Sequence, residues 1–293
     1  MNRRGFLRRT LGLLALAAIP KLPGVRITPL PELPPKVAKT LPLRTTEGFA
    51  DRLSGEDLWY EISILYLVKA AIGHVTFRKA LLPGKFKGSA EARAVGFIGW
   101  LTDYRKVGFY TDLTVMEDRG KPRLVPVRFE RRMVEEESDY HSIHRFDYAR
   151  RKWTFRAYED GKLTRAKLRD IPAGVFYDEL ISAAYNFRLG VYGPPKKGMT
   201  FAVTSIPHLG VDKFDVRVCT DEEEAKETPL KDKAPGAAYV VQVPIDQKIF
   251  GIQAGVVKFV TDADLKPLAV AVQNAEHFGD VLAELVPKPK DEK

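Results

Sequence analysis

The fold of this chain is decided by residues 55–68, which read Gly-Glu-Asp-Leu-Trp-Tyr-Glu-Ile-Ser-Ile-Leu-Tyr-Leu-Val. Hydrophobic side chains recur at every second position from Leu58 to Val68. A repeat of two residues is typical of a β-strand that buries one face. Leu65 and Leu67 also make the opposite face apolar, so we expect the end of this strand to be covered on both sides.

Similar stretches follow along the chain, and short turns separate them. Asp160-Gly161 is the clearest turn, because both residue types accept a positive φ angle and favour a tight hairpin. Consecutive strands joined by short turns form an antiparallel sheet, and so many strands must curl or split into layers. The sequence therefore predicts a mainly β protein with a large curved antiparallel sheet, in the form of a half-barrel or a barrel-like structure. Further strands are expected near residues 75–77, 88–96, 105–116, 123–133, 138–149, 152–158, 162–169, 199–206, 211–219, 238–245, 252–261, 266–273 and 278–286.

One principal helix is expected over residues 178–189, packed on the sheet. Its hydrophobic residues, from Leu180 to Phe187, recur at helical spacing and predict a single apolar stripe. We therefore expect Leu180 to be buried and Glu179 to face solvent. Asp178 is the expected residue at the N-terminal cap.

The first residues resemble a twin-arginine export signal. The pair Arg3 and Arg4 is followed by Phe6 and Leu7 at the offsets of that signal. The apolar run behind them is shorter than the roughly 20 residues that span a bilayer, and it contains the small residues of a signal peptidase site. Residues 1–18 are interpreted as an export signal that binds the twin-arginine export machinery. An ordinary secretory signal or an uncleaved anchor is the alternative.

The remaining organisation follows from composition. Residues 19–47 hold seven prolines and predict an extended linker. A single antiparallel β domain is expected over 48–287, and a charged tail over 288–293. Within the domain, residues 220–236 are charged and lack periodicity, so we expect an exposed loop there. The mature protein is expected in the periplasm or otherwise outside the cytoplasm, without a membrane-spanning segment.

Composition also excludes several functional classes. Cys219 is the only cysteine among the 293 residues, so an intramolecular disulfide and a cysteine-rich metal site are both excluded. The formal net charge of +9 includes four arginines of the expected signal. The other charges are mixed in sign and form no long basic block, so no nucleic-acid partner is expected.

Three motifs, in the right order over about residues 55–286, resemble a bacterial cell-envelope family known as DUF3108. They are Gly55-Glu56-x-Leu58-x-Tyr60, Asp178-x-Leu180-x-Ser182-x-x-Tyr185-x-x-Arg188 and Asp262-x-x-Leu265-x-Pro267-Leu268. The resemblance implies an envelope protein with a curved antiparallel sheet like the half-barrels of periplasmic lipoprotein carriers. It implies no activity, cofactor or catalytic residue.

The strand over residues 138–149 provides a candidate ligand-binding wall. Tyr140, His144, Phe146 and Tyr148 fall on one face of it by their spacing of two. Such a face either lines a site for an amphipathic molecule or forms ordinary core, and the sequence leaves both readings open.

Two other candidates involve charged or metal-binding side chains. Arg188 at the end of the expected helix either binds the last helix carbonyls or contacts an anionic ligand. His141 and His144 would share a face on a helix, but on a strand they point to opposite faces. We therefore predict no metal site and no cofactor.

These patterns favour a non-enzymatic protein whose partner is a lipid or other amphipathic molecule, a glycan, or an envelope protein. No catalytic residue is assigned. The alternative is a hydrolase of envelope polymers that uses carboxylates from separate strands. Glu56, Glu61 and Asp103 are candidates for that role.

Overall fold

The computed structural model describes residues 48–64, 68–96, 99, 104–135, 138–208, 211–245, 255–275 and 279–290. The expected export signal, the linker over 19–47 and Asp103 lie outside these residues.

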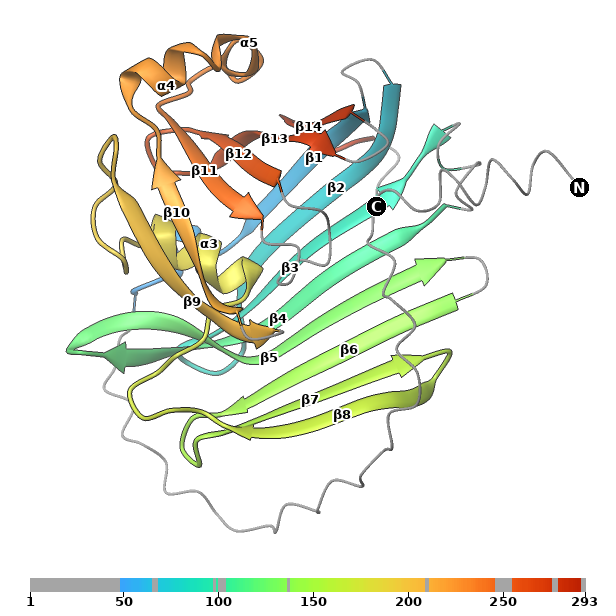
Figure 1. Cartoon of the computed structure of the whole chain (residues 1–293), viewed down its shortest axis with the longest axis vertical. Helices are drawn as coiled ribbons and strands as arrows, with labels where there is room; N and C mark the ends of the chain where they lie inside the picture. Colours follow the sequence, from blue (N-terminus) through green and yellow to red (C-terminus); the bar gives the residue numbers. More distant parts are fainter. Residues whose placement is uncertain are drawn as a thin grey trace, which may run out of the picture.

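Within these residues, fourteen strands form one sheet, and every neighbouring pair of strands is antiparallel. Figure 1 shows the sheet bending so that β9–β13 turn back over the side on which helix α3 lies. The predicted fold class is therefore confirmed. The strands are β1 (Glu56–Ile64), β2 (Val68–Lys79), β3 (Lys85–Ala94), β4 (Lys106–Asp118), β5 (Lys121–Glu135), β6 (Ser138–Asp147), β7 (Lys152–Glu159), β8 (Lys162–Asp170), β9 (Thr200–His208), β10 (Val211–Val218), β11 (Tyr239–Ile245), β12 (Gly255–Thr261), β13 (Pro267–Ala275) and β14 (Gly279–Val286).

The strand order is simple because almost every strand pairs with the next one along the chain. The sheet runs from β8 at one edge through β1, continues across the β1–β14 pairing, and ends at β9. The two edge strands are thus consecutive in sequence, and the segment between them carries α3 (Leu180–Arg188). Asp160 and Gly161 have φ angles of 50° and 74°, which confirms the predicted tight turn between β7 and β8.

Helix α3 lies between two arms of the sheet (Figure 1). Ile181 and Tyr185 pack into a core cluster supplied by strands β2–β5. Ala183 and Phe187 pack into a second cluster supplied mainly by strands β9–β11. We call the side of the sheet that carries α3 the inner face.

This placement corrects the prediction of a single apolar stripe. Leu180 is 44% exposed, whereas Glu179 is 4% exposed. Glu179, and not Asp178, is the N-terminal cap of α3, in a reciprocal capping box with Ser182. The physical reason is that both arms cover the helix, so that polar side chains are buried along with apolar ones.

The charged segment 220–236 is also more ordered than predicted. It contains two short helices, α4 (Asp221–Ala225) and α5 (Thr228–Lys231). Glu224 is buried and accepts a hydrogen bond from the backbone N–H of Val240 at 3.1 Å. The segment therefore packs against β11 instead of forming an exposed loop.

A glycine in β3 permits the close approach of α3 to the sheet. A Cβ atom at Gly88 would lie 2.7 Å from Cγ2 of Ile181 and 3.2 Å from Cγ2 of Thr111. Carbon atoms in ordinary contact are about 3.5–4.0 Å apart. A side chain at this position would therefore push the helix away from the sheet.

Candidate ligand-binding face

A buried polar cluster anchors the segment that precedes α3. The fully buried Asp178 forms an ion pair with Arg123 of β5. Its carboxylate also accepts hydrogen bonds from the hydroxyl of Tyr192 at 2.5 Å and from Nδ2 of Asn186 at 2.9 Å. Burial raises the pKa of the Asp178 carboxyl, and Arg123 opposes that rise. Because Asp178 has protein partners on both of its oxygens, this cluster is an anchor for α3.

Arg188, at the other end of α3, has a fixed partner on β1. Its Nη1 and Nη2 atoms contact the two carboxylate oxygens of Glu56 at 2.7 and 2.6 Å. The hydroxyl of Tyr185 donates to the same carboxylate at 3.0 Å. This bidentate ion pair is the arrangement that best suits a guanidinium and a carboxylate. Arg188 is a predicted ligand contact, and Glu56 is a candidate catalytic carboxylate of the alternative hydrolase hypothesis. In the structure the two side chains bind each other.

The predicted wall on β6 divides into a closed part and an open part. Phe146 and Tyr148 are buried and belong to a core cluster that includes Tyr177, from the segment between β8 and α3. Tyr140 and His144 lie on the same face of the strand but are only half-buried. Only the second pair is therefore exposed to a ligand on the inner face.

An aromatic row continues from His144 across four neighbouring strands. Its members are Phe109 of β4, Phe129 of β5, His144 of β6 and Phe155 of β7. The ring centroids are separated by 6.2 Å from Phe109 to Phe129, 5.8 Å from Phe129 to His144, and 4.8 Å from His144 to Phe155. All four side chains are half-buried, so together they form a continuous, partly accessible apolar strip.

The indole of Trp153 fixes the tautomer of His144, the histidine in this row. Nε1 of Trp153 donates a hydrogen bond to Nδ1 of His144 at 3.1 Å. A nitrogen that accepts a hydrogen bond carries no proton, so a neutral His144 ring has its proton on Nε2. The His144 ring stacks on Trp153 at an interplanar angle of 4° and is tilted by 42° and 48° to its row neighbours Phe129 and Phe155.

Arg131 of β5 places a positive charge beside the aromatic row. Its Cζ atom lies 5.9 Å from the centroid of the Phe109 ring, and burial lowers the pKa of its guanidinium. Its Nε atom is buried without a hydrogen-bond partner, and no ion pair of Arg131 occurs among the described residues. The side chain as a whole is half-buried, and a cation that is partly removed from water without a counter-ion is costly, so this position favours a bound anion.

The edge strand β8 adds three more cations on the inner face. Arg165, Lys167 and Arg169 stand opposite Ala157, Phe155 and Trp153 in the antiparallel register. Burial lowers the pKa of the Lys167 ammonium group, and the two neighbouring arginines lower it further. The described part of the chain supplies no ion pair to any of the three. The aromatic row is thus bordered by positive charge on two sides.

Sequence reasoning identified the aromatic face but missed these cations. A period of two places charged residues on the solvent side of a strand by default. In β8, Arg165, Lys167 and Arg169 lie on the inner face, which becomes evident only when Lys167 is paired with Phe155. Arg131 stands opposite Phe109 of β4 and Ser142 of β6, and its place on the inner face follows only from these pairings between strands.

The remaining candidates point elsewhere. His141 lies on the opposite face of β6 from His144, as predicted, and its Nε2 is 2.6 Å from Glu130. Glu61 forms an ion pair with Lys69 at 2.6 Å. Across the described residues, no group of three histidine, cysteine or acidic side chains is arranged to hold a metal ion.

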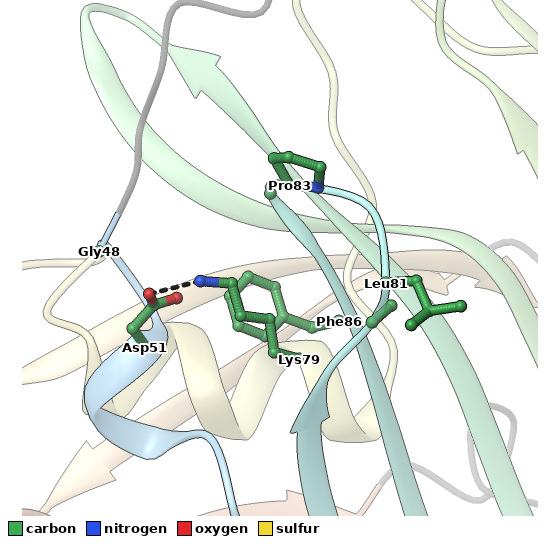
Figure 2. A pocket seen from close by; sticks show the side chains of 8 residues that line it. Gly48, Asp51, Lys79, Leu81, Pro83 and Phe86 are labelled. Atoms are coloured by element: carbon green, nitrogen blue, oxygen red, sulfur yellow. Dashed lines mark hydrogen bonds and ion pairs between the residues drawn. The ribbon is translucent and has the colours of Figure 1, made fainter.

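Two hollows lie apart from the aromatic row, at the β2–β3 hairpin. Their volumes are about 130 and 590 Å³. Figure 2 shows the smaller one, with Lys79 reaching Asp51 across it and Leu81 pointing away from both. No helix in the described part of the chain is long and apolar enough to cross a membrane.

Comparisons with known proteins add little to these observations. No protein-family model matches the chain, and no curated protein matches it. Its structure is similar to the crystal structure of a beta-barrel-like protein of domain of unknown function DUF1849 from Brucella abortus. The identity is 9%, the TM-score is 0.40, and the match covers 78% of this chain and 94% of that chain. At this distance the likeness carries no argument about function, and the resemblance to DUF3108 stays a prediction.

Proposed function

We propose that this chain is an exported cell-envelope protein that binds an anionic amphipathic molecule, such as a lipid with an acidic head group, without catalysing a reaction. The single observation that carries the proposal is Arg131. It is a half-buried cation with a fully buried Nε atom, it contacts an aromatic ring, and it has no ion pair among the described residues.

The arrangement suits a molecule with one apolar and one acidic part. The apolar part packs on the aromatic row, where rings offer a large contact area at a low cost in conformational entropy. The acidic group binds Arg131, because a guanidinium donates paired hydrogen bonds to a carboxylate or phosphate. Lys167 and its two arginine neighbours add a positive potential that attracts the same ligand.

The exported location rests on the leader sequence and on the family resemblance. The pair Arg3 and Arg4 with Phe6 and Leu7 supports passage through the twin-arginine machinery, and the DUF3108-like motifs support an envelope protein. A periplasmic protein meets lipids and lipid precursors, so the proposed compartment agrees with the proposed ligand.

The test is a calorimetric titration of the purified chain with palmitate and with the uncharged alcohol of the same chain length. We expect palmitate to bind more tightly than the alcohol. A hydrogen bond to a charged group contributes about 1.5–3 kcal/mol, so Arg131→Met is expected to weaken palmitate binding by about 10- to 100-fold. Methionine keeps the apolar packing of the arginine stem and removes the charge together with the N–H donors.

Arg145→Met is the matched control, because Arg145 is an exposed arginine on the opposite face of the neighbouring strand β6. It should leave palmitate binding unchanged. Equal binding of palmitate by Arg131→Met and by the unmodified chain would exclude Arg131 as the anion site and overturn the proposal. A preference for a glycan, with no binding of palmitate or the alcohol, would replace the amphipathic ligand.

A further inference from the structure

The turn between β2 and β3 exposes two large hydrophobic side chains. Leu81 is fully exposed and Leu82 is 65% exposed. Turns usually contain glycine, proline, asparagine, aspartate or serine, and single exposed hydrophobic residues are common on protein surfaces. Two adjacent exposed leucines at the tip of a hairpin differ from such single residues, because together they form one projecting apolar surface.

This tip is an ordered part of the fold. The backbone N–H of Ala80 donates to the carbonyl of Lys85 at 2.9 Å and closes the turn. Gly84 has a φ of +66°, and its carbonyl accepts a hydrogen bond from the N–H of Val115 in β4 at 2.8 Å. Leu81 lines the edge of the smaller hollow, and Figure 2 shows its side chain directed away from Lys79 and Asp51. The two leucines are therefore exposed on a turn whose backbone is fixed by hydrogen bonds.

Positive charges surround the two leucines. Arg78 and Lys79 precede the turn, and Lys85 and Lys87 follow it. Lys79 pairs with Asp51 at 2.7 Å and Lys87 lies 3.4 Å from Asp112. For Arg78 and Lys85, no ion pair occurs among the described residues.

Apolar side chains flanked by cations are complementary to one surface in particular. At the face of a bilayer, leucines enter the boundary between head groups and acyl chains, and lysine or arginine side chains bind anionic head groups. A stable protein interface commonly buries about 800 Å² on each partner, and two leucines on a narrow tip offer far less. The charge and shape of the tip therefore favour a lipid surface over a protein partner.

We propose that the β2–β3 hairpin tip is a membrane-contact site for bilayers that contain anionic phospholipid. Leu81 and Leu82 enter the interfacial region, while Arg78 and Lys85 contact the lipid phosphates. The contact is reversible and peripheral. This inference is independent of the proposed ligand site, because none of its residues belongs to the aromatic row or its bordering cations.

Vesicle co-sedimentation of the full chain tests the proposal. The vesicles contain equal amounts of phosphatidylglycerol and phosphatidylcholine, or phosphatidylcholine alone. We expect binding to the anionic vesicles to be about tenfold tighter, and the double substitution Leu81→Ser and Leu82→Ser to remove most of it. Leu180→Ser, which changes another exposed leucine, is the control and should bind as the unmodified chain does. Equal binding by the double variant, or equal binding to both vesicles, would overturn the proposal.

A fluorescent label distinguishes insertion from a purely electrostatic contact. Cys219 is buried, so Leu81→Cys provides a single accessible thiol for an environment-sensitive dye. The dye emission is expected to shift to the blue with anionic vesicles, whereas a dye attached after Tyr104→Cys, at another exposed position, should not respond. The blue shift at position 81 should persist when Arg131→Met is added, which separates this site from the proposed ligand site. An unchanged emission at position 81 would contradict insertion of the tip.

Discussion

The ionisation of Glu179, the N-terminal cap of α3, is coupled to folding. The pH dependence of stability therefore tests whether this side chain is buried. Its two carboxylate oxygens accept hydrogen bonds from the backbone N–H groups of Ile181 at 2.7 Å and Ser182 at 2.8 Å. Burial raises the pKa of this carboxyl from 4.5 to about 7, against the effect of those hydrogen bonds. The charged form is thus disfavoured in the folded protein relative to the unfolded chain.

The sign of the pH dependence follows from this rise. Where the folded-state pKa is higher, the folded protein binds the proton more tightly, and this contribution to stability is complete below pH 4.5. It is lost as the pH rises to and beyond about 7. A pKa unit corresponds to about 1.4 kcal/mol, so the whole effect amounts to about 3 kcal/mol.

The assay is urea unfolding of the unmodified chain and of Glu179→Gln, measured from pH 5 to pH 8. We expect the free energy of unfolding of the unmodified chain, minus that of the variant, to fall by about 2–3 kcal/mol over this range. Asp178 titrates in both proteins, so the difference reports mainly on Glu179. Glu222→Gln, at an exposed position, should retain the slope of the unmodified chain. A difference that is flat, or that rises with pH, would refute a buried carboxyl with a raised pKa.

Two further predictions concern the packing of α3. Gly88→Ala should lower the free energy of unfolding by about 1–3 kcal/mol in urea titrations, because its Cβ would lie 2.7 Å from Ile181. Adding Ile181→Leu, which has no Cγ2 methyl group, should recover part of the loss, and simple additivity of the two losses would contradict the proposed clash. Leu180→Asp should change stability by no more than about 0.5 kcal/mol, since the side chain is 44% exposed and an acid suits a helix N-terminus. A large drop in its melting temperature would show that Leu180 is packed.

The strands could be predicted from sequence because their signal is local. A period of two and a turn such as Asp160-Gly161 depend only on neighbouring residues, and both were confirmed. The orientation of α3 could not be predicted in this way. A stripe rule assumes that one side of a helix faces water, whereas α3 lies between two arms and leaves Leu180 exposed and Glu179 buried.

The candidate site was predicted only in its apolar part. Tyr140 and His144 share the inner face, as their spacing indicated. Arg188 forms an ion pair with Glu56, which lies on a strand far away in the sequence. A pattern within one segment cannot predict an ion pair between two distant segments. Lys167 was missed for the opposite reason, because a charged residue on the inner face contradicts the usual alternation of a strand.

Arg123 and Arg131 show why the inner face divides into an anchor and a candidate site. Both arginines belong to β5, and burial acts against the charge of each. Arg123 is paired with Asp118 and Asp178, so its burial is compensated within the fold. Arg131 has an aromatic ring beside it and no ion pair among the described residues. Removing one member of a buried ion pair is destabilising because it leaves the other charge unpaired, whereas removing a charge that has no internal partner leaves no such group behind. Arg131→Met should therefore leave folding intact while it removes anion binding, whereas Arg123→Met strands the Asp178 carboxylate and should destabilise the protein.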